Sequence, residues 1–224
     1  MNMRESAARQ SWSAAARALI CGYVDAYTFL TFGVYSSFMT GNTTSGGVHA
    51  GEIRFAQAAH NLLPIPFFLL GVMIGALLGH ADERRALRRL STLVGVLLLA
   101  DVAGTRIGCP DWLSIVILSA GMGAMNTSVT QVGGQPVGLG FLTGDLNNLA
   151  KLIALQFRSP APQSQGVWSA HKRVALLASL WMAFIGGAVL GGALAPVFAV
   201  WTPLLPAIAL LILALPGRSE RLAN

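Results

Sequence analysis

Apolar runs separated by short polar segments make up most of this 224-residue chain. A helix needs about 20 apolar residues to cross a hydrocarbon core of about 30 Å. On that measure the pattern predicts six membrane spans, at residues 14–34, 58–79, 90–105, 112–131, 174–195 and 198–215. Two other segments, 36–50 and 141–157, are too short to span and carry polar residues. We expect them to be re-entrant or half-helical, which is tolerated at membrane depth only where protein or a wet cavity covers the backbone.

Each of these two segments contains a copy of one five-residue motif. Residues 38–42 read Phe-Met-Thr-Gly-Asn, and residues 141–145 read Phe-Leu-Thr-Gly-Asp. Each copy follows an apolar segment with a polar residue inside it, Asp25 in the first half and Asn126 in the second. Further along, a spaced series of small residues also recurs, as Gly71, Gly75 and Gly79 and then Gly187, Gly191 and Ala195. Three matching features in one order indicate a tandem repeat.

The composition also indicates a membrane protein. The chain is 54% hydrophobic and 11% charged, whereas soluble domains have about 25% charged residues. The net charge of +6 does not indicate a nucleic-acid protein, because the basic residues form short clusters between apolar runs without interleaved aromatic residues. Cys21 and Cys109 have no metal-ligand or redox spacing, so we expect them to be packing residues.

The distribution of Lys and Arg predicts how the spans are oriented. With six spans and both termini in the cytoplasm, the outer segments hold only Arg54 and Arg106, while the inner segments include the Arg-rich loop 82–89. This asymmetry follows the positive-inside rule. If the two motif segments also crossed the membrane, the loop 82–89 would lie outside. Each half, 1–104 and 105–224, therefore has three spans, and an odd number makes the repeat inverted.

Intramembrane acidic residues are the first candidates for function. A carboxylate at membrane depth is costly, so Asp25 and Asp145 should face protein or water. Contact with an ion, a proton or a substrate is one interpretation, and a structural hydrogen bond between helices is the other. Asp101 has no counterpart in the other half and lies near a predicted helix end, which favours snorkelling to the interface.

The Thr-Gly-Asn and Thr-Gly-Asp sequences resemble helix starts, with a hydroxyl cap followed by a permissive glycine. Such a helix start at membrane depth presents free N–H groups and a positive dipole end to an anion, whereas the plain alternative is capping alone. Each half holds one carboxylate and one carboxamide in exchanged places, which would avoid like-charge repulsion between converging sites. The candidate binding residues are Asp25, Thr40, Gly41, Asn42, Asn126, Thr143, Gly144 and Asp145.

Other chemistry is not indicated. The four His residues are scattered, and no metal site, cofactor loop or catalytic constellation can be recognised, so we do not expect an enzyme. The glycine series are small-xxx-small faces that let helix backbones approach closely. We expect them to pack the second and fifth spans within one chain rather than to form a dimer face.

The segments Gly-Tyr-Val-Asp-Ala at 22–26 and Phe-Met-Thr-Gly-Asn at 38–42 resemble the YoaK family of bacterial inner-membrane proteins, the UPF0700 type. The resemblance includes residues 123–126 and 141–145 and so covers most of the chain. The family commonly has Gln-Asn and Thr-Gly-Thr where this chain has Met125-Asn126 and Thr143-Gly144-Asp145. The resemblance implies a multi-spanning protein of a bacterial inner membrane, and it implies no substrate.

The pattern favours an all-α integral membrane protein that acts as a small secondary transporter or permease, with its site between the two motif segments. A non-transporting scaffold or sensor is the alternative. Transport predicts a wet cavity holding Asp25 and Asp145, whereas a scaffold predicts that these acids are paired in a dry bundle. The expected partners are the lipid bilayer and a small molecule or ion, without nucleic acid, and homo-oligomerisation is left open.

Overall fold

The fold is helical throughout. The computed structural model describes residues 3–79, 83–128, 131–132, 135–136, 142–158 and 170–215. Their helices are α1 (Met3–Phe32), α2 (Met39–Gly51), α3 (Phe55–Leu62), α4 (Pro64–Leu78), α5 (Glu83–Arg106), α6 (Asp111–Asn126), α7 (Leu142–Arg158), α8 (Ala170–Phe198), the 3₁₀ turn η1 (Ala199–Trp201) and α9 (Leu204–Ala214). Two short strands, β1 (Gln131–Val132) and β2 (Gln135–Pro136), pair antiparallel between α6 and α7.

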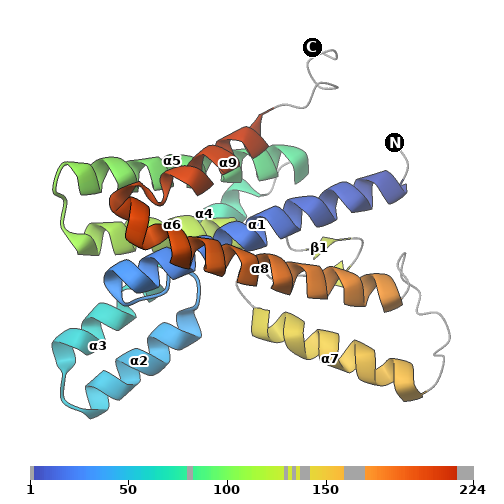
Figure 1. Ribbon diagram of the computed structural model, residues 1–224, viewed down its shortest axis with the longest axis horizontal. Coiled ribbons are helices and arrows are strands. Elements are labelled where there is room, and N and C mark those ends of the chain that lie inside the picture. Colours follow the sequence, from blue (N-terminus) through green and yellow to red (C-terminus); the bar gives the residue numbers. More distant parts are fainter. Residues whose placement is uncertain are drawn as a thin grey trace.

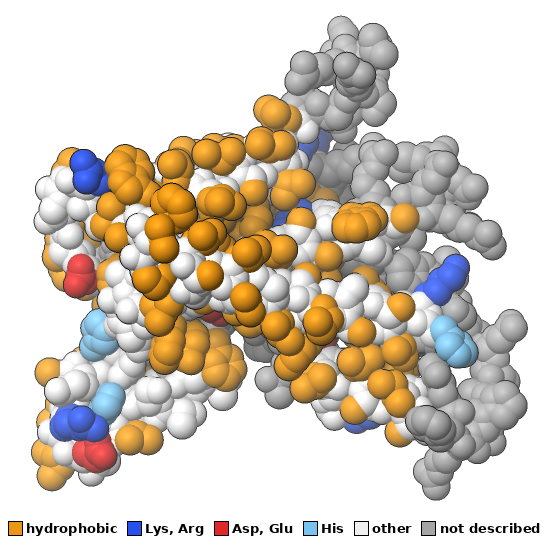
Figure 2. Space-filling model, viewed as in Figure 1, with side chains coloured by type: hydrophobic (Ala, Val, Ile, Leu, Met, Phe, Trp, Pro, Cys, Tyr) orange, Lys and Arg blue, Asp and Glu red, His pale blue; other side chains and the backbone are white. Residues whose placement is uncertain are grey.

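The outer surface is apolar over the long helices. Residues 55–78 and 171–201 form helices long and apolar enough to cross a membrane, and only 28% of the most apolar stretch of each is buried inside the molecule. Exposed Leu, Ile, Val, Met and aromatic side chains cover α4, α8 and α9, and Figure 2 shows hydrophobic side chains across much of one face. Apolar surface of this extent is typical of lipid-facing helices.

Helix α1 packs along α8 through close backbone contact. A Cβ atom on Gly22 would collide with the carbonyl oxygen of Phe184, and one on Gly187 would collide with the carbonyl oxygen of Leu19. Glycine at both positions lets the two backbones approach, as in other membrane helix pairs. The predicted packing role of Gly187 within one chain is therefore confirmed.

Helix α4 packs along α6 in the same way. A Cβ on Gly123 would collide with the carbonyl oxygen of Phe68, and one on Gly71 with the carbonyl oxygen of Ala120. Gly79 differs, because a Cβ there would approach only carbonyl oxygens of its own helix. The glycine series thus packs helices together at Gly71 and Gly75, while Gly79 lies past the contact.

The long helices run in two opposite directions. In Figure 1, α1, α5 and α8 run from right to left, whereas α4, α6 and α9 run from left to right. Helices α5 and α9 pack against each other in antiparallel fashion: Arg88, early in α5, donates a 3.1 Å hydrogen bond to the carbonyl of Ala214 at the end of α9. Near the other end, the Arg106 guanidinium lies 5.2 Å from the ring centre of Trp201.

Three predicted boundaries were wrong. The first helix already begins at Met3, and the expected loop 82–89 is helical from Glu83 onward. Arg, Ala and Leu are good helix formers, and Ala86 and Leu90 are buried on one face of α5, so the helix continues past the expected end of the apolar stretch. At the other end of the chain, the sixth helix begins only at Leu204, after η1.

The second span is also not one regular helix. Helix α3 ends at Leu62 and α4 begins at Pro64, because proline lacks an N–H and suits the first position of a helix. The α3 side chains His60 and Asn61 contact the carbonyl oxygens of Phe32 and Gly33 at 2.8 and 3.4 Å. These contacts fasten α3 to the end of α1, where the backbone carbonyls lack partners within the helix.

Candidate functional site

Asp25 is one of two predicted site residues that hold the connection between α1 and α2. It lies in α1 with 4% of its surface exposed. One carboxyl oxygen accepts hydrogen bonds from the Ser37 backbone N–H at 2.7 Å and the Ser36 hydroxyl at 2.9 Å, and the other accepts the Ser37 hydroxyl at 2.5 Å. These donors satisfy the carboxyl locally. All three donors belong to the connection that follows α1, so these hydrogen bonds do not join two helices.

Asn42 holds the same connection from the α2 side. Its amide oxygen accepts the Tyr35 backbone N–H at 2.9 Å, and its amide nitrogen donates to the Tyr35 carbonyl at 2.6 Å. The side chain therefore pairs with Tyr35 as a neighbouring strand would, using a donor and an acceptor at once. Asp25 and Asn42 together fix three consecutive residues, 35–37, in front of α2.

The start of α2 differs from the prediction. The helix begins at Met39, its N-cap is Phe38, and no side chain caps it, so Thr40 is not the hydroxyl cap that we expected. The N-cap lies two residues earlier, at Phe38, whose ring packs edge-on against Tyr35 with ring centres 5.4 Å apart. Thr40 and Gly41 instead lie in the first helical turn, where backbone N–H groups have no acceptor in their own helix.

The second motif begins its helix at the matching residue. Helix α7 starts at Leu142, so Gly144 is its third residue, as Gly41 is the third residue of α2. Asp145 follows and is buried, with 6% of its surface exposed, whereas Gly144 is exposed. Asn126 is the last residue of α6 and is half-buried. The side chain of Thr143 lies outside the described residues.

The two motif helices pack on different neighbours. Helix α2 packs on α3 and α4, whereas α7 packs on α8. In Figure 1 the amino-terminal ends of α2 and α7 both lie toward the middle of the molecule, and the helices run from there toward opposite ends. Within the first half, Asp25 and Asn42 are linked because both form hydrogen bonds with residues 35–37.

Asp101 is buried, contrary to the prediction that it snorkels to the interface. Only 1% of its surface is exposed. The prediction failed because α6 covers this face of α5, with Ser114 beside the Asp101 turn: the Thr105 hydroxyl bonds the Asp101 carbonyl and lies 3.4 Å from the Ser114 hydroxyl. The position of Asp101 within an apolar run indicated burial, but we gave more weight to the nearby helix end, which favours exposure at the interface.

Arg17 is a second buried charge within the bundle. It is 3% exposed, donates a 2.8 Å hydrogen bond to the Ser91 hydroxyl of α5, and also donates to the carbonyl and hydroxyl of Ser13. Arg17 therefore joins α1 to α5 within the bundle.

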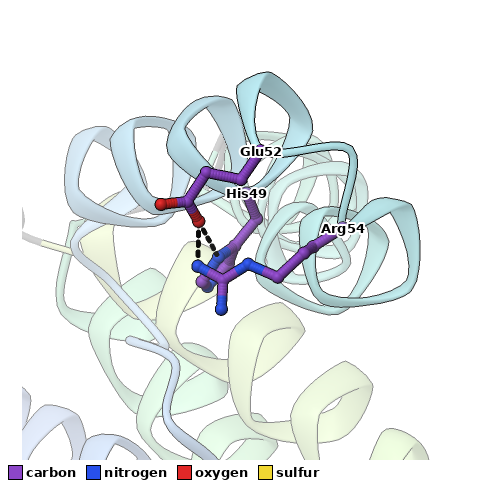
Figure 3. Close-up of polar contacts among 3 residues, drawn as sticks. All are labelled: His49, Glu52 and Arg54. Atoms are coloured by element: carbon purple, nitrogen blue, oxygen red, sulfur yellow. Dashed lines mark hydrogen bonds and ion pairs between the residues drawn. The ribbon is translucent and has the colours of Figure 1, made fainter.

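Two polar features lie away from the motif helices. A cleft of about 620 Å³ opens between α4, α5 and α9, and its lining includes the guanidinium groups of Arg85, Arg88 and Arg89. At the α2–α3 connection, Glu52 pairs with Arg54 and lies 3.8 Å from His49 (Figure 3). The hydrogen bond from Arg54 lowers the pKa of the exposed Glu52 carboxyl. Among the described residues, no group of three or more His, Cys, Asp or Glu side chains could hold a metal ion.

Comparison with known proteins places the chain in a family. Residues 13–215 match the family described as "Protein of unknown function (DUF1275)". The chain is 31% identical over 199 residues to the UPF0700 transmembrane protein RA0705 of Rhizobium meliloti (strain 1021), covering 88% of this chain and 82% of the relative. No solved structure matches it. With its apolar outer surface and long apolar helices, the chain is a membrane protein that belongs to the UPF0700 (DUF1275) family.

Proposed function

We propose that this protein is a small secondary transporter or permease, not an enzyme, built from two inverted three-span repeats, 1–104 and 105–224. Its substrate site would lie between the starts of α2 and α7, at the Thr-Gly-Asn and Thr-Gly-Asp sequences. The observation that carries the proposal is that the glycine contacts between helices occur twice, in equivalent positions of the two halves.

These contacts match residue by residue. Gly22 meets Phe184, which is three residues before Gly187; its counterpart Gly123 meets Phe68, which is three residues before Gly71. The pairing of α1 with α8 is therefore equivalent to the pairing of α6 with α4. An internal two-fold relation between the halves produces such reciprocal contacts, and a coincidental sequence repeat does not.

The third set of contacts follows the same relation. A Cβ on Gly191 would collide with the Tyr23 backbone, and one on Gly75 would collide with Ala124, the residue equivalent to Tyr23. The opposite directions of α1, α5 and α8 and of α4, α6 and α9 support the inverted arrangement. In inverted-repeat transporters, half-helices whose amino ends point at the midplane bind substrate between the repeats.

The ends of α2 and α7 suit an anionic group. The first-turn amides of each helix lack acceptors in that helix and lie at the positive end of its dipole. The Thr40 side chain is exposed beside these amides, and Gly144 leaves the α7 backbone open. Asp145, in the first turn of α7, would carry a proton or cation in the same site, whereas Asp25 already has its hydrogen bonds from Ser36 and Ser37.

Cysteine cross-linking tests whether the two helix starts face each other. In a background with Cys21 and Cys109 replaced by alanine, Thr40→Cys combined with Gly144→Cys should be joined by a short bifunctional thiol reagent. Both positions are exposed, so cysteine should be tolerated. The control combines Thr40→Cys with Lys151→Cys, which lies two turns further along α7 and is also exposed. Absence of cross-linking in the Thr40→Cys and Gly144→Cys pair would contradict a substrate site shared by the two helix starts.

A ligand screen tests transport itself. Purified protein would be heated with small anions, cations and metabolites, since a ligand that binds only the folded state raises the melting temperature. Uptake of any stabilising compound into proteoliposomes follows. We expect Thr40→Val to reduce this uptake and Thr43→Val, whose hydroxyl bonds the Met39 carbonyl on the same helix, to leave it unchanged. Equal uptake by both variants would place the substrate elsewhere.

A non-transporting membrane scaffold or sensor is the second candidate. It is favoured by one observation, the closed hydrogen bonding of Asp25 and Asn42 within the connection before α2. Under this proposal both residues only shape the connection. Binding of no compound in the screen, together with cross-linking of the protein to another membrane protein in cells, would support the scaffold.

A further inference from the structure

The carboxyl group of Asp101 is the most isolated polar group in the described part of the chain. It lies in α5 with 1% of its surface exposed, and neither of its two carboxyl oxygens has a hydrogen-bond partner. A bare carboxylate in this position would lose its hydration without compensation, which proteins rarely tolerate. Asp25 shows the contrast, because three hydrogen bonds from Ser36 and Ser37 reach its carboxyl.

The surroundings of Asp101 contain hydroxyl groups and no described cation partner. From α1, the buried phenol of Tyr27 lies within electrostatic range. From α6, the Ser114 hydroxyl lies beside the Asp101 carboxyl, and Asp111 lies within electrostatic range of the same Tyr27 phenol. Helices α4 and α9 and the turn η1 contribute no titratable side chain.

The nearest cation in α5 is directed elsewhere. Arg106 lies five residues beyond Asp101, and its guanidinium group is stacked over the Trp201 ring. The buried cation Arg17 of α1 bonds Ser13 of its own helix and Ser91, which lies ten residues before Asp101 in α5. No described salt bridge therefore reaches Asp101.

We propose that Asp101 is a proton-binding site: its carboxyl group holds a proton in this conformation. A protonated carboxyl is neutral and can donate one hydrogen bond, for which the Ser114 hydroxyl is the adjacent acceptor. The site is separate from the motif helices α2 and α7. If the protein is a transporter, this site is where a coupling proton would bind. The proton-binding proposal itself does not depend on transport.

Infrared spectroscopy of the purified protein tests this directly. A protonated carboxyl gives a C=O band above the amide bands, and we expect such a band at neutral pH in the wild type. Asp101→Asn should remove the Asp101 component and so weaken the band, whereas Asp111→Asn, at the exposed start of α6, should leave the band unchanged. Persistence of the full band in a folded Asp101→Asn variant would overturn the proposal.

A second measurement needs no variant that might fail to fold. A lipid-soluble carbodiimide reacts with protonated carboxyl groups, so mass spectrometry of the wild type should find the Asp101 peptide modified at neutral pH and less modified at alkaline pH. An unmodified Asp101 peptide at every pH would overturn the proposal. A sodium-specific effect on stability would also overturn it. If sodium but not choline raised the melting temperature, and Asp101→Asn removed that effect, the site would hold a metal cation instead of a proton. Neither readout depends on transport.

Discussion

Asn42 shows how one side chain can decide the shape of a connection. Its amide group offers a donor and an acceptor to the Tyr35 backbone. Aspartate has nearly the same shape but, when ionised, can only accept. The corresponding position in the second half is Asp145, so this position of the repeat holds a carboxamide in the first half and a carboxyl group in the second.

We predict that Asn42→Asp destabilises the protein by about 1–3 kcal/mol, because the partly buried Tyr35 carbonyl loses its donor and faces a carboxylate. A protonated aspartic acid can donate again, so the difference from the wild type should narrow as the pH falls. Melting temperatures in detergent across a pH series measure both effects. Asn148→Asp, on the exposed side of α7, is the matched control and should change little. An equal loss in both variants would contradict the pairing with Tyr35.

At the Asp25 carboxyl we predict a local effect of similar size. Ser37→Ala removes one hydrogen bond to a carboxyl group and should cost about 1.5–3 kcal/mol. Thr44→Ala removes a hydroxyl that bonds only the Thr40 carbonyl of its own exposed helix face, and should cost much less. Chemical denaturation or heating in detergent gives the comparison. If Thr44→Ala were the more damaging change, Asp25 would not depend on Ser37.

Among the elements, the paired helices α1–α8 and α4–α6 depend on glycine at the contact. We predict that Gly191→Leu and Gly75→Leu destabilise the bundle by more than the usual overpacking cost of about 1–3 kcal/mol, because the added side chain meets backbone that cannot rotate away. Gly192→Leu places the same side chain next door in α8, where a Cβ would meet nothing within 4 Å. Yield and melting temperature in detergent are the measurements. Equal behaviour of Gly191→Leu and Gly192→Leu would show that the contact does not limit stability.

The elements were more predictable than the site. Spacing alone placed Gly71, Gly75, Gly187 and Gly191 on contact faces, because close backbone approach excludes larger side chains at each of these positions. It did not predict that Phe38 is the N-cap of α2, since that boundary accompanies ring packing with Tyr35. The local sequence around Asp101 does not show that α6, the next helix, folds back to cover this face of α5. Burial by tertiary contacts is therefore the part that single-sequence reasoning missed.

For the whole molecule, the positive-inside rule predicts that the Arg-rich start of α5 is cytoplasmic and the α5–α6 turn external. Ala86 is buried, so labelling there would report packing and not topology. Arg89→Cys and Ile107→Cys are exposed positions at opposite ends of α5. In the background without Cys21 and Cys109, a membrane-impermeant thiol reagent added to intact cells should label position 107 and not 89. Labelling of position 89 and not 107 would mean that the protein has the opposite orientation in the membrane.

The pairing of α1 with α8 has a consequence for synthesis of the chain. Helix α1 leaves the ribosome first, yet the partner that covers Gly22 and Leu19 belongs to residues 170–198 and emerges last but one among the helices. Until then, the contact face of α1 must lie against lipid or an insertase, and the contact face of α4 is likewise uncovered until α6 has emerged. Neither half can complete its own packing, so assembly is a late, post-insertion event. If the chain is divided at the 107–110 turn, the two fragments should therefore assemble into a stable complex when they are produced together. Either fragment produced alone should be degraded.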